Sequence, residues 1–307
     1  MKNSNPNLCS FITLIFILLN AIQLHAQENQ QIIYKPKENN ELNVLLKSKT
    51  LRIAMYKGDT PPFYYQLELE DGTKGKLQGI DVEIIEGFAR KLGIAPVYIR
   101  TDTLDGAIDM VANGGADVAI CKLSITFSRV SKVLFTKPYI KLRKGLLVNR
   151  VELEALQKKL GKVSKTEAIQ QLSGKLGVIE DSSYVTFAQQ RFQNEKLEHI
   201  SLPSWDDIVD NVSEGKYIAA FRDEAEIKRV IADDKSKAIP LLTVDFVGDY
   251  DLKGIALPLN SHHLKSLLDL HIDSLGLELT ASSLLFDYPS VIKQLNRYKK
   301  QRIEKIN

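Results

Sequence analysis

Apolar and polar positions along the chain follow two alternating spacings from Leu51 onward. Short apolar runs typical of buried strands cover residues 51–55, 96–99 and 116–120. Between them, apolar side chains recur on one helical face over residues 81–92 and 104–113. Asp81 is placed to cap the first of these helices and Gly93 to end it. Strands that alternate with helices of this length predict an α/β fold whose parallel strands are joined by helical crossovers.

The same alternation returns after residue 145 and predicts a second α/β unit. Its apolar runs cover residues 145–148, 176–179, 218–221 and 239–244, with an amphipathic helix over 205–212. Residues 151–172 are rich in Lys and Glu, and their leucine spacing predicts a surface helix. Residues 264–279 and 291–300 are predicted to be helical as well.

One internal similarity relates the two units. A shift of 101 residues aligns residues 104–114 with residues 205–215 and superposes the strands that follow them. Chance can produce such a match between two helix-to-strand segments, so common origin of the halves stays open. If the halves are equivalent, Lys122 and Asp223 occupy matching positions just past the end of a strand. Open α/β sheets bind ligands at the carboxyl ends of their strands.

The N-terminal segment has the pattern of a secretory signal peptide. Lys2 precedes an apolar run from residue 11 to residue 19, and the small residue Ala26 suits cleavage just after it. Cys9 lies ahead of the apolar run, where it cannot accept a lipid at the cleavage point. A periplasmic or secreted, soluble protein is expected. Residues 27–50 are polar and are predicted to be a solvated extension ahead of the first strand.

Composition narrows the function classes further. The chain has 307 residues and a formal charge of +3, so no nucleic-acid partner is implied. The histidines have no metal-ligand spacing, and neither a phosphate-binding glycine loop nor a nucleophile elbow is present. Once the signal peptide is removed, Cys121 is the single cysteine, which excludes an intramolecular disulfide. These patterns favour a binding protein without cofactor or metal, and a monomer.

Several segments together resemble the family 3 solute-binding proteins, the periplasmic receptors for amino acids and related polar solutes. The first unit carries PPFYY at 61–65, GIDVEIIEGFARKLG at 79–93, GGADVAI at 114–120 and SITFSRVSKVLFTKPY at 124–139. The second carries GKLGVIEDSS at 174–183, YIAAFRDEAEI at 217–227 and GIALPLNS at 254–261. The resemblance extends from Leu51 to near the C-terminus, and the first-unit motifs are specific in combination, order and spacing.

The resemblance implies a two-lobed Venus-flytrap fold that closes over its ligand about two hinge crossings, near residues 139–144 and 247–253. The expected organisation is a signal peptide over 1–26, an extension over 27–50, a first lobe over 51–143 that resumes over 251–307, and a second lobe over 144–250. Such receptors deliver a small amino acid or carboxylate to an ABC permease, which is the implied partner. A sensory receptor on the same fold stays open as an alternative.

The resemblance also implies roles for individual residues. Arg129 matches the arginine whose fork pairs with a ligand carboxylate, a geometry that lysine cannot reproduce. Ser124 would add a hydroxyl, Ser182 would close over the carboxylate, and Asp223 would hold an α-ammonium. The aromatic wall would be formed by Phe63 and Tyr64, for which plain core packing is the alternative.

Two positions depart from the family pattern. Lys122 and Asp181 stand where the family often has glycine. A cation beside the ammonium site repels an α-amino group, which favours an organic acid, an acidic or modified amino acid, or a ligand bound through the Lys122 and Asp223 pair. The competing enzyme class resembles periplasmic cyclohexadienyl dehydratases, for which Glu180 or Asp181 would supply the acid.

Overall fold

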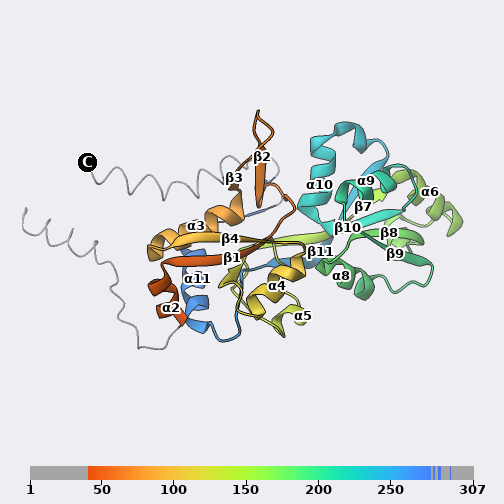
Figure 1. Ribbon diagram of the computed structural model, residues 1–307. Coiled ribbons are helices and arrows are strands. Elements are labelled where there is room, and N and C mark those ends of the chain that lie inside the picture. Colours follow the sequence, from red (N-terminus) through yellow and green to blue (C-terminus); the bar gives the residue numbers. More distant parts are fainter. Residues whose placement is uncertain (1–40, 278, 281–282, 285–290, 292–307) are drawn as a thin grey trace, which may run out of the picture. The chain divides into compact units, whose positions relative to one another are not determined.

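The residues that the structure describes form two five-stranded sheets and one separate two-stranded hairpin (Figure 1). A computed structural model describes residues 41–277, 279, 280, 283, 284 and 291. The predicted signal peptide, most of the predicted extension and nearly all of the predicted helix over 291–300 lie outside these residues. Glu41–Ser48 forms a helix, α2, where a solvated extension was predicted, so that prediction is wrong for these residues.

The first sheet has the strand order β4-β1-β5-β12-β6. Its parallel strands are β4 (Ala95–Thr101), β1 (Thr50–Tyr56) and β5 (Val118–Ala119). The strand β12 (Ala256–Leu257) runs antiparallel between β5 and β6 (Leu134–Phe135). The helices of this part are α3 (Ile80–Leu92), α4 (Leu104–Ala112), α5 (Phe127–Val130) and α11 (His262–Leu275). The hairpin pairs β2 (Tyr65–Glu68) with β3 (Lys74–Gln78).

The second sheet has the order β11-β7-β10-β8-β9. Its parallel strands are β9 (Leu197–Leu202), β8 (Gly174–Ile179) and β10 (Ala219–Asp223), and its antiparallel strands are β7 (Ile140–Asn149) and β11 (Leu241–Lys253). Its helices are α6 (Arg150–Lys159), α7 (Lys165–Gln170), α8 (Ser183–Arg191), α9 (Trp205–Ser213) and α10 (Glu224–Asp233), with a 3₁₀ turn at Lys235–Ala238. Both sheets are therefore mixed, whereas the sequence predicted parallel pairing.

Strands β7 and β11 connect the two sheets. They pair over two stretches, and the second runs from Tyr250 opposite Arg143 to Lys253 opposite Ile140. At that end β11 also bonds to the segment between β5 and β6 of the first sheet, because the Ile125 amide donates to the Leu252 carbonyl. The crossing segments predicted near residues 139–144 and 247–253 coincide with this paired stretch.

The internal match of 101 residues corresponds to equivalent places in the two sheets. Strand β4 is the edge strand beside β1, as β9 is beside β8. Helices α4 and α9 lead into β5 and β10 respectively, and each of these strands is the third parallel member of its sheet. Lys122 lies just past the end of β5, as predicted, whereas Asp223 is the last residue of β10 rather than lying beyond it.

Core packing agrees with the apolar patterns. Helix α4 buries Ala107, Ile108 and Val111, and the Thr103 hydroxyl caps it by accepting from the Gly106 amide. Helix α9 likewise buries Ile208, Val209 and Val212 against the second sheet. Gly93 ends α3 in the left-handed conformation, as predicted. Asp81 does not cap α3, because that helix already begins at Ile80 after Gly79.

Two further predictions need correction. The charged stretch over 151–172 is two helices, α6 and α7, interrupted by a turn that contains Gly161. The predicted strand over 239–244 extends to Lys253, because its polar second half pairs with β7. Within the part of the chain that the structure describes, no helix has the length and apolar character needed to cross a membrane.

Candidate functional site

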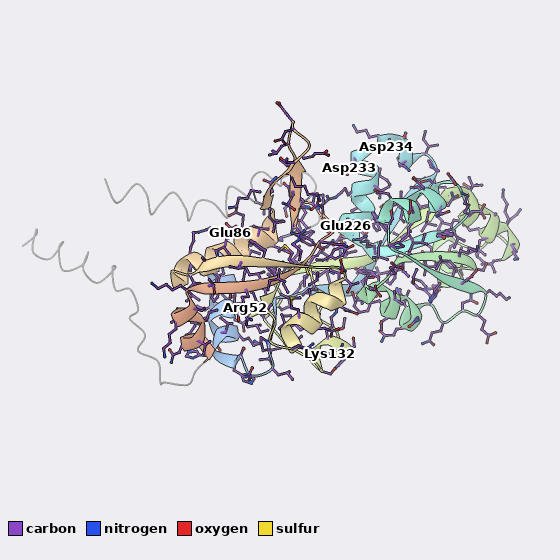
Figure 2. All side chains as sticks on the ribbon, viewed as in Figure 1. Arg52, Glu86, Lys132, Glu226, Asp233 and Asp234 are labelled. Atoms are coloured by element: carbon purple, nitrogen blue, oxygen red, sulfur yellow. The ribbon has the colours of Figure 1, made fainter. Side chains whose placement is uncertain are left out.

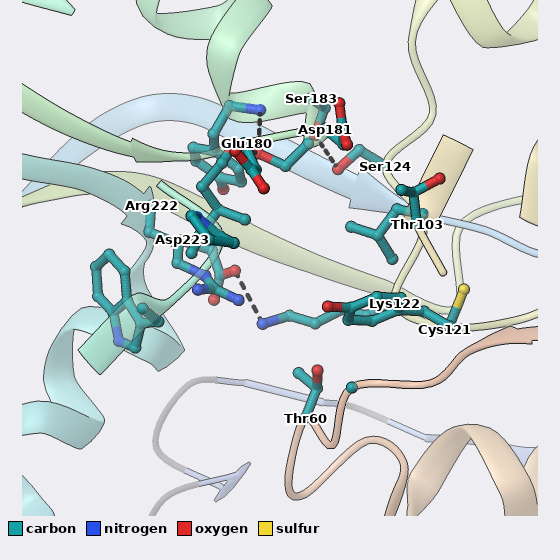
Figure 3. Close-up of a pocket in the computed structure, with 18 of the residues that line it drawn as sticks. Thr60, Thr103, Cys121, Lys122, Ser124, Glu180, Asp181, Ser183, Arg222 and Asp223 are labelled. Atoms are coloured by element: carbon teal, nitrogen blue, oxygen red, sulfur yellow. Dashed lines mark hydrogen bonds and ion pairs between the residues drawn. The ribbon is translucent and has the colours of Figure 1, made fainter. Parts of the chain in front are cut away.

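A cavity of about 410 Å³ lies at the carboxyl ends of the parallel strands of both sheets. The first sheet contributes the segments that follow β1, β4 and β5, and the second contributes those that follow β8 and β9 and the end of β10. Lys253, at the end of β11, completes the wall. Figure 3 shows part of this lining, with Lys122 extending toward Asp223. Ligands of open α/β sheets bind at such strand ends.

Arg129 belongs to the short helix α5 and lines the cavity, although only 5% of it is exposed. Its Nε and Nη2 donate to Oδ1 of Asp105 at 3.1 and 2.8 Å, and its Nη1 donates to the Ser124 carbonyl at 3.2 Å. A guanidinium has five N–H groups. Among the described residues, one N–H on each Nη therefore has no acceptor, and these donors can hydrogen-bond to a ligand carboxylate.

Lys122 is buried between two carboxylates from the second sheet. Its Nζ lies 2.9 Å from Oδ2 of Asp223 and 2.6 Å from Oε1 of Glu226. The Phe63 ring lies beneath the ammonium, with 4.6 Å between Nζ and the ring centroid. Only 6% of the Lys122 side chain is exposed, so this cluster is almost dry. The pair between Lys122 and Asp223 that the sequence predicted is present, and Glu226 extends it.

The two residues that replace a common family glycine share an unusual backbone conformation. Lys122 has a φ of 54° and Asp181 a φ of 50°. This left-handed region costs a non-glycine residue roughly 1–2 kcal/mol, which accounts for glycine at such positions. The strained turn is held in place because the Lys122 amide donates to Oδ2 of Asp81 at 2.7 Å. Strain of this kind concentrates at functional sites.

Burial and charge shift the pKa of two carboxyls beside Lys122. Burial raises the pKa of Asp81 to about 7, although the amide and ammonium of Lys122 oppose the shift. For Glu226, burial alone would raise the pKa, but Lys122, Arg222 and Arg229 outweigh it and lower the pKa below its usual range. Glu226 is therefore ionised at neutral pH inside the protein.

Ser124 is part of a buried polar network where β11 meets the first sheet. Its hydroxyl donates to Oδ2 of Asp251 at 3.0 Å. It accepts from the Ser183 hydroxyl at 2.7 Å and from Nζ of Lys253 at 2.8 Å. These contacts use the donor and both acceptor sites of a hydroxyl. In this structure the Ser124 side chain therefore connects parts of the protein rather than presenting a free hydroxyl to the cavity.

The other predicted site residues differ in their exposure to the cavity. Ser182 lines it and caps α8, accepting from the Tyr184 amide and donating to the Ile179 carbonyl. Tyr64 also lines it, and its hydroxyl accepts from that of Thr60 at 3.0 Å. Phe63 is fully buried and does not line the cavity; it contacts the cavity only through Lys122.

Sequence reasoning missed several residues of the site. Arg222 lies over the Trp205 ring, with 4.9 Å from the guanidinium carbon to the ring centroid, and both line the cavity. Glu226 follows Asp223 by three residues, so helical spacing could have placed the two carboxylates on one face. Lys253 was predicted only as the end of a crossing segment, directly before the motif at 254–261, and nothing in that pattern indicated a side chain in the cavity wall. Among the described residues, no group of three or more His, Cys, Asp and Glu side chains could hold a metal ion.

These sheets, their connecting strands and the cavity at their strand ends define a two-lobed periplasmic binding fold. Residues 51–275 match the family described as bacterial extracellular solute-binding proteins, family 3. Because the match covers most of the chain, the protein belongs to this family.

Known proteins with similar sequences and structures agree with that assignment. A probable histidine-binding protein of Campylobacter jejuni is 27% identical over 61% of this chain and 65% of its own length. The histidine-binding periplasmic protein of Escherichia coli is 24% identical over 54% of this chain and 59% of its own length. The chain thus spans just under two thirds of the length of these curated relatives.

Solved structures confirm the fold. An amino acid ABC transporter substrate-binding protein from Streptococcus pneumoniae, bound to L-arginine, has a TM-score of 0.62 at 21% identity, covering 82% of this chain and 98% of its own. An ancestral amino acid-binding protein, a precursor of cyclohexadienyl dehydratase, has a TM-score of 0.61 at 19% identity, covering 81% of this chain and 99% of its own.

Proposed function

We propose that the protein is an exported receptor that captures an amino acid or a related small carboxylate in this cavity and passes it to an ABC-type permease. The observation that carries the proposal is the Arg129 guanidinium, which lines a cavity of about 410 Å³ and keeps one N–H on each Nη without an acceptor among the described residues. Histidine-binding and arginine-bound relatives support the ligand class.

The mechanism follows from where the contacts originate. Arg129 comes from α5, between two strands of the first sheet, whereas Ser182 follows β8 and Asp223 ends β10 of the second sheet. A ligand that contacts both sets joins residues 51–143 and 251–307 to residues 144–250, and the paired stretch of β7 and β11 would act as the hinge. Closure expels water and strengthens each polar contact to the ligand. The protein would act as a monomer in the periplasm after cleavage near Ala26.

The ligand itself can be identified without assuming its class. Small molecules released from purified, denatured protein are analysed by mass spectrometry, and a small carboxylate in stoichiometric amount is expected. Recovery of only compounds that lack a carboxylate would contradict the proposal, because these leave the two free Arg129 donors unpaired.

Replacing Arg129 tests its role directly. Arg129→Lys keeps the charge and loses the fork, so binding of the identified carboxylate should weaken by about 2–5 kcal/mol. Isothermal titration calorimetry measures the change. The matched control is Arg52→Lys, because Arg52 pairs with Asp117 at 2.7 Å, lies away from Glu226 in Figure 2 and is outside the cavity wall. Affinity of Arg129→Lys within about threefold of the parent would refute the anchor role.

A dehydratase-like enzyme is the second candidate, because one structural relative is a precursor of cyclohexadienyl dehydratase. Glu180 and Asp181 line the cavity but are exposed to water. A carboxylic acid that donates a proton at neutral pH usually needs a desolvated site. We therefore expect no turnover when the protein is incubated with prephenate or arogenate and the products are followed by absorbance. Product formation above that of heat-denatured protein would favour the enzyme.

A further inference from the structure

The surroundings of Lys122 bear on which carboxylate the cavity takes. We propose that the Lys122 ammonium occupies the place of a ligand ammonium group, so that the cavity selects carboxylates without a free α-amino group, such as 2-hydroxy and 2-oxo acids; this rests on the function proposed above.

Carboxylates that could accept a ligand ammonium in the dry part of the cavity are already used. Oδ2 of Asp223 contacts Nζ of Lys122 at 2.9 Å, and its Oδ1 accepts from the Glu226 amide at 3.3 Å. Glu226 contacts the same Nζ at 2.6 Å. A ligand ammonium that enters this site finds no unpaired carboxylate of the protein. It loses its hydration and gains no partner.

The charge balance of the cavity wall also indicates that no buried carboxylate is available to a ligand ammonium. Asp223 and Glu226 contribute two negative charges, which Lys122 and the nearby Arg222 neutralise. The remaining acids of the wall lie toward water. Asp59 and Asp102 are exposed and pair with Lys74 at 3.6 Å and Lys57 at 2.6 Å respectively. Glu180 and Asp181 are exposed on the segment after β8. Ion pairs at such exposed positions are weak, so they do not replace a buried partner.

Both the backbone and the ammonium of Lys122 are held in position. Its backbone lies in the left-handed region and is anchored by Asp81, and its ammonium rests on the Phe63 ring. Moving the side chain away would leave both Asp223 and Glu226 buried without their common cation, which is strongly unfavourable. The α-amino group of a ligand is therefore repelled by the Lys122 ammonium, which cannot move away without leaving two buried carboxylates unpaired.

The same ammonium suits an oxygen on the ligand. An ammonium has three N–H donors and no acceptor. Asp223 and Glu226 take two of the three, which leaves one N–H for a further acceptor. A 2-hydroxyl or 2-oxo oxygen can accept that hydrogen bond, whereas a protonated amine has only donors to offer. The carboxylate of either ligand would still pair with Arg129.

Matched ligand pairs test this selectivity on the full-length mature protein. Calorimetry compares alanine with lactate, histidine with imidazolelactate, phenylalanine with phenyllactate and glutamate with 2-hydroxyglutarate, each in the same configuration. In the pairs that bind, the hydroxy acid should bind at least about tenfold tighter. Equal or tighter binding of the amino acid overturns the proposed selectivity and leaves the carboxylate receptor intact. If no member of any pair binds, the receptor proposal falls together with the selectivity.

Removing the internal ammonium should reverse the preference. Lys122→Gly frees both carboxylates and suits the backbone, whose φ is 54° at this position. The ratio of amino-acid to hydroxy-acid affinity should rise at least about tenfold. The matched control is Lys162→Gly, because exposed Lys162 has a φ of 63° and lies outside the cavity wall. Its ratio should stay within about twofold of the parent.

An unchanged ratio in Lys122→Gly overturns the selectivity mechanism. Should that variant fail to fold, Lys122→Met removes the charge and keeps most of the packing over Phe63, and the same ratio decides. Arg129→Lys distinguishes the two proposals, because it should weaken both members of a pair alike and leave their ratio unchanged.

Discussion

At the scale of single residues, the site depends on charges that are buried together. Only 6% of the Lys122 side chain and 7% of the Glu226 side chain are exposed, and both sit in a cluster that also holds Asp223. Breaking such a pair by removing one member is costly, because it leaves the other charge without water and without compensation. Exposed ion pairs behave differently, since water replaces the lost partner.

Glu226→Gln tests this difference. The substitution keeps the side-chain volume and removes one of the two charges that hold Lys122, so the free energy of unfolding should fall by about 3 kcal/mol. Urea titration at neutral pH measures it. The control is Asp109→Asn, which breaks the exposed pair with Lys132 at 2.8 Å and should cost about 0–1 kcal/mol. Equal losses in the two variants would show that the Lys122 cluster is not dry.

The sequence predicted part of this cluster and not the rest. The 101-residue match brought Lys122 and Asp223 together because it related two strand ends, which is a property of backbone topology. It could not assign Glu226 or the ring of Phe63 to the same ammonium, because those contacts depend on side-chain directions across two sheets. The hydrogen bonds of Ser124 with Asp251 and Lys253 could not be predicted for the same reason, since 127 residues separate Ser124 from Asp251.

At the scale of elements, apolar periodicity predicted many of the strands and helices that are buried on one face, although not α8 and α10, which also bury side chains. It missed β9, whose side chains are mostly exposed or half-buried, and the hairpin β2–β3, which has no fully buried residue. It also shortened β11, since the polar half of that strand pairs with β7 rather than covering a core. Periodicity detects burial, so elements that are ordered by hydrogen bonds alone escape it.

The turn before α3 shows how closely one element supports the cavity wall. The amides of Ile80 and Asp81 donate to the carbonyls of Pro62 and Phe63, which fixes the segment that carries Thr60 and Tyr64. A Cβ at Gly79 would lie 2.3 Å from the Phe63 carbonyl oxygen, and Gly79 has a φ of 126°. Only glycine allows this approach.

Gly79→Ala should therefore destabilise the protein by about 3 kcal/mol or more, because backbone atoms that cannot give way surround the new methyl group. Gly93→Ala is the control at the other end of the same helix. It also has a positive φ, of 69°, but open space around the Cβ, and should cost about 1–2 kcal/mol. Thermal unfolding of the two variants compares them. A smaller loss in Gly79→Ala than in Gly93→Ala would contradict the close approach.

At the scale of the whole molecule, two buried groups titrate in opposite senses. Burial lowers the pKa of His271 to about 4 from 6.5, so between these values the unfolded chain holds more protons and stability rises with pH. Burial raises the pKa of Asp81 to about 7 from 3.8, so in that window the folded chain holds more protons and stability falls as pH rises. The two windows overlap, and the contributions, on the order of 3 and 4 kcal/mol, largely cancel.

Variants that lack one of the two groups should show the pH dependence of the free energy of unfolding that cancels in the parent. Asp81→Asn keeps an oxygen for the Lys122 amide, and His271→Gln keeps a donor for the Ile84 carbonyl, which His271 Nε2 meets at 2.9 Å. Between about pH 4.5 and pH 7, the free energy of unfolding relative to the double variant should rise in Asp81→Asn, fall in His271→Gln and change least in the parent. Urea titrations across this range measure all four proteins. Parallel profiles for the two single variants would mean that the pKa of neither group differs between the folded and unfolded chain, whereas opposite slopes would establish that one buried acid and one buried base make opposing contributions to the pH dependence of its stability.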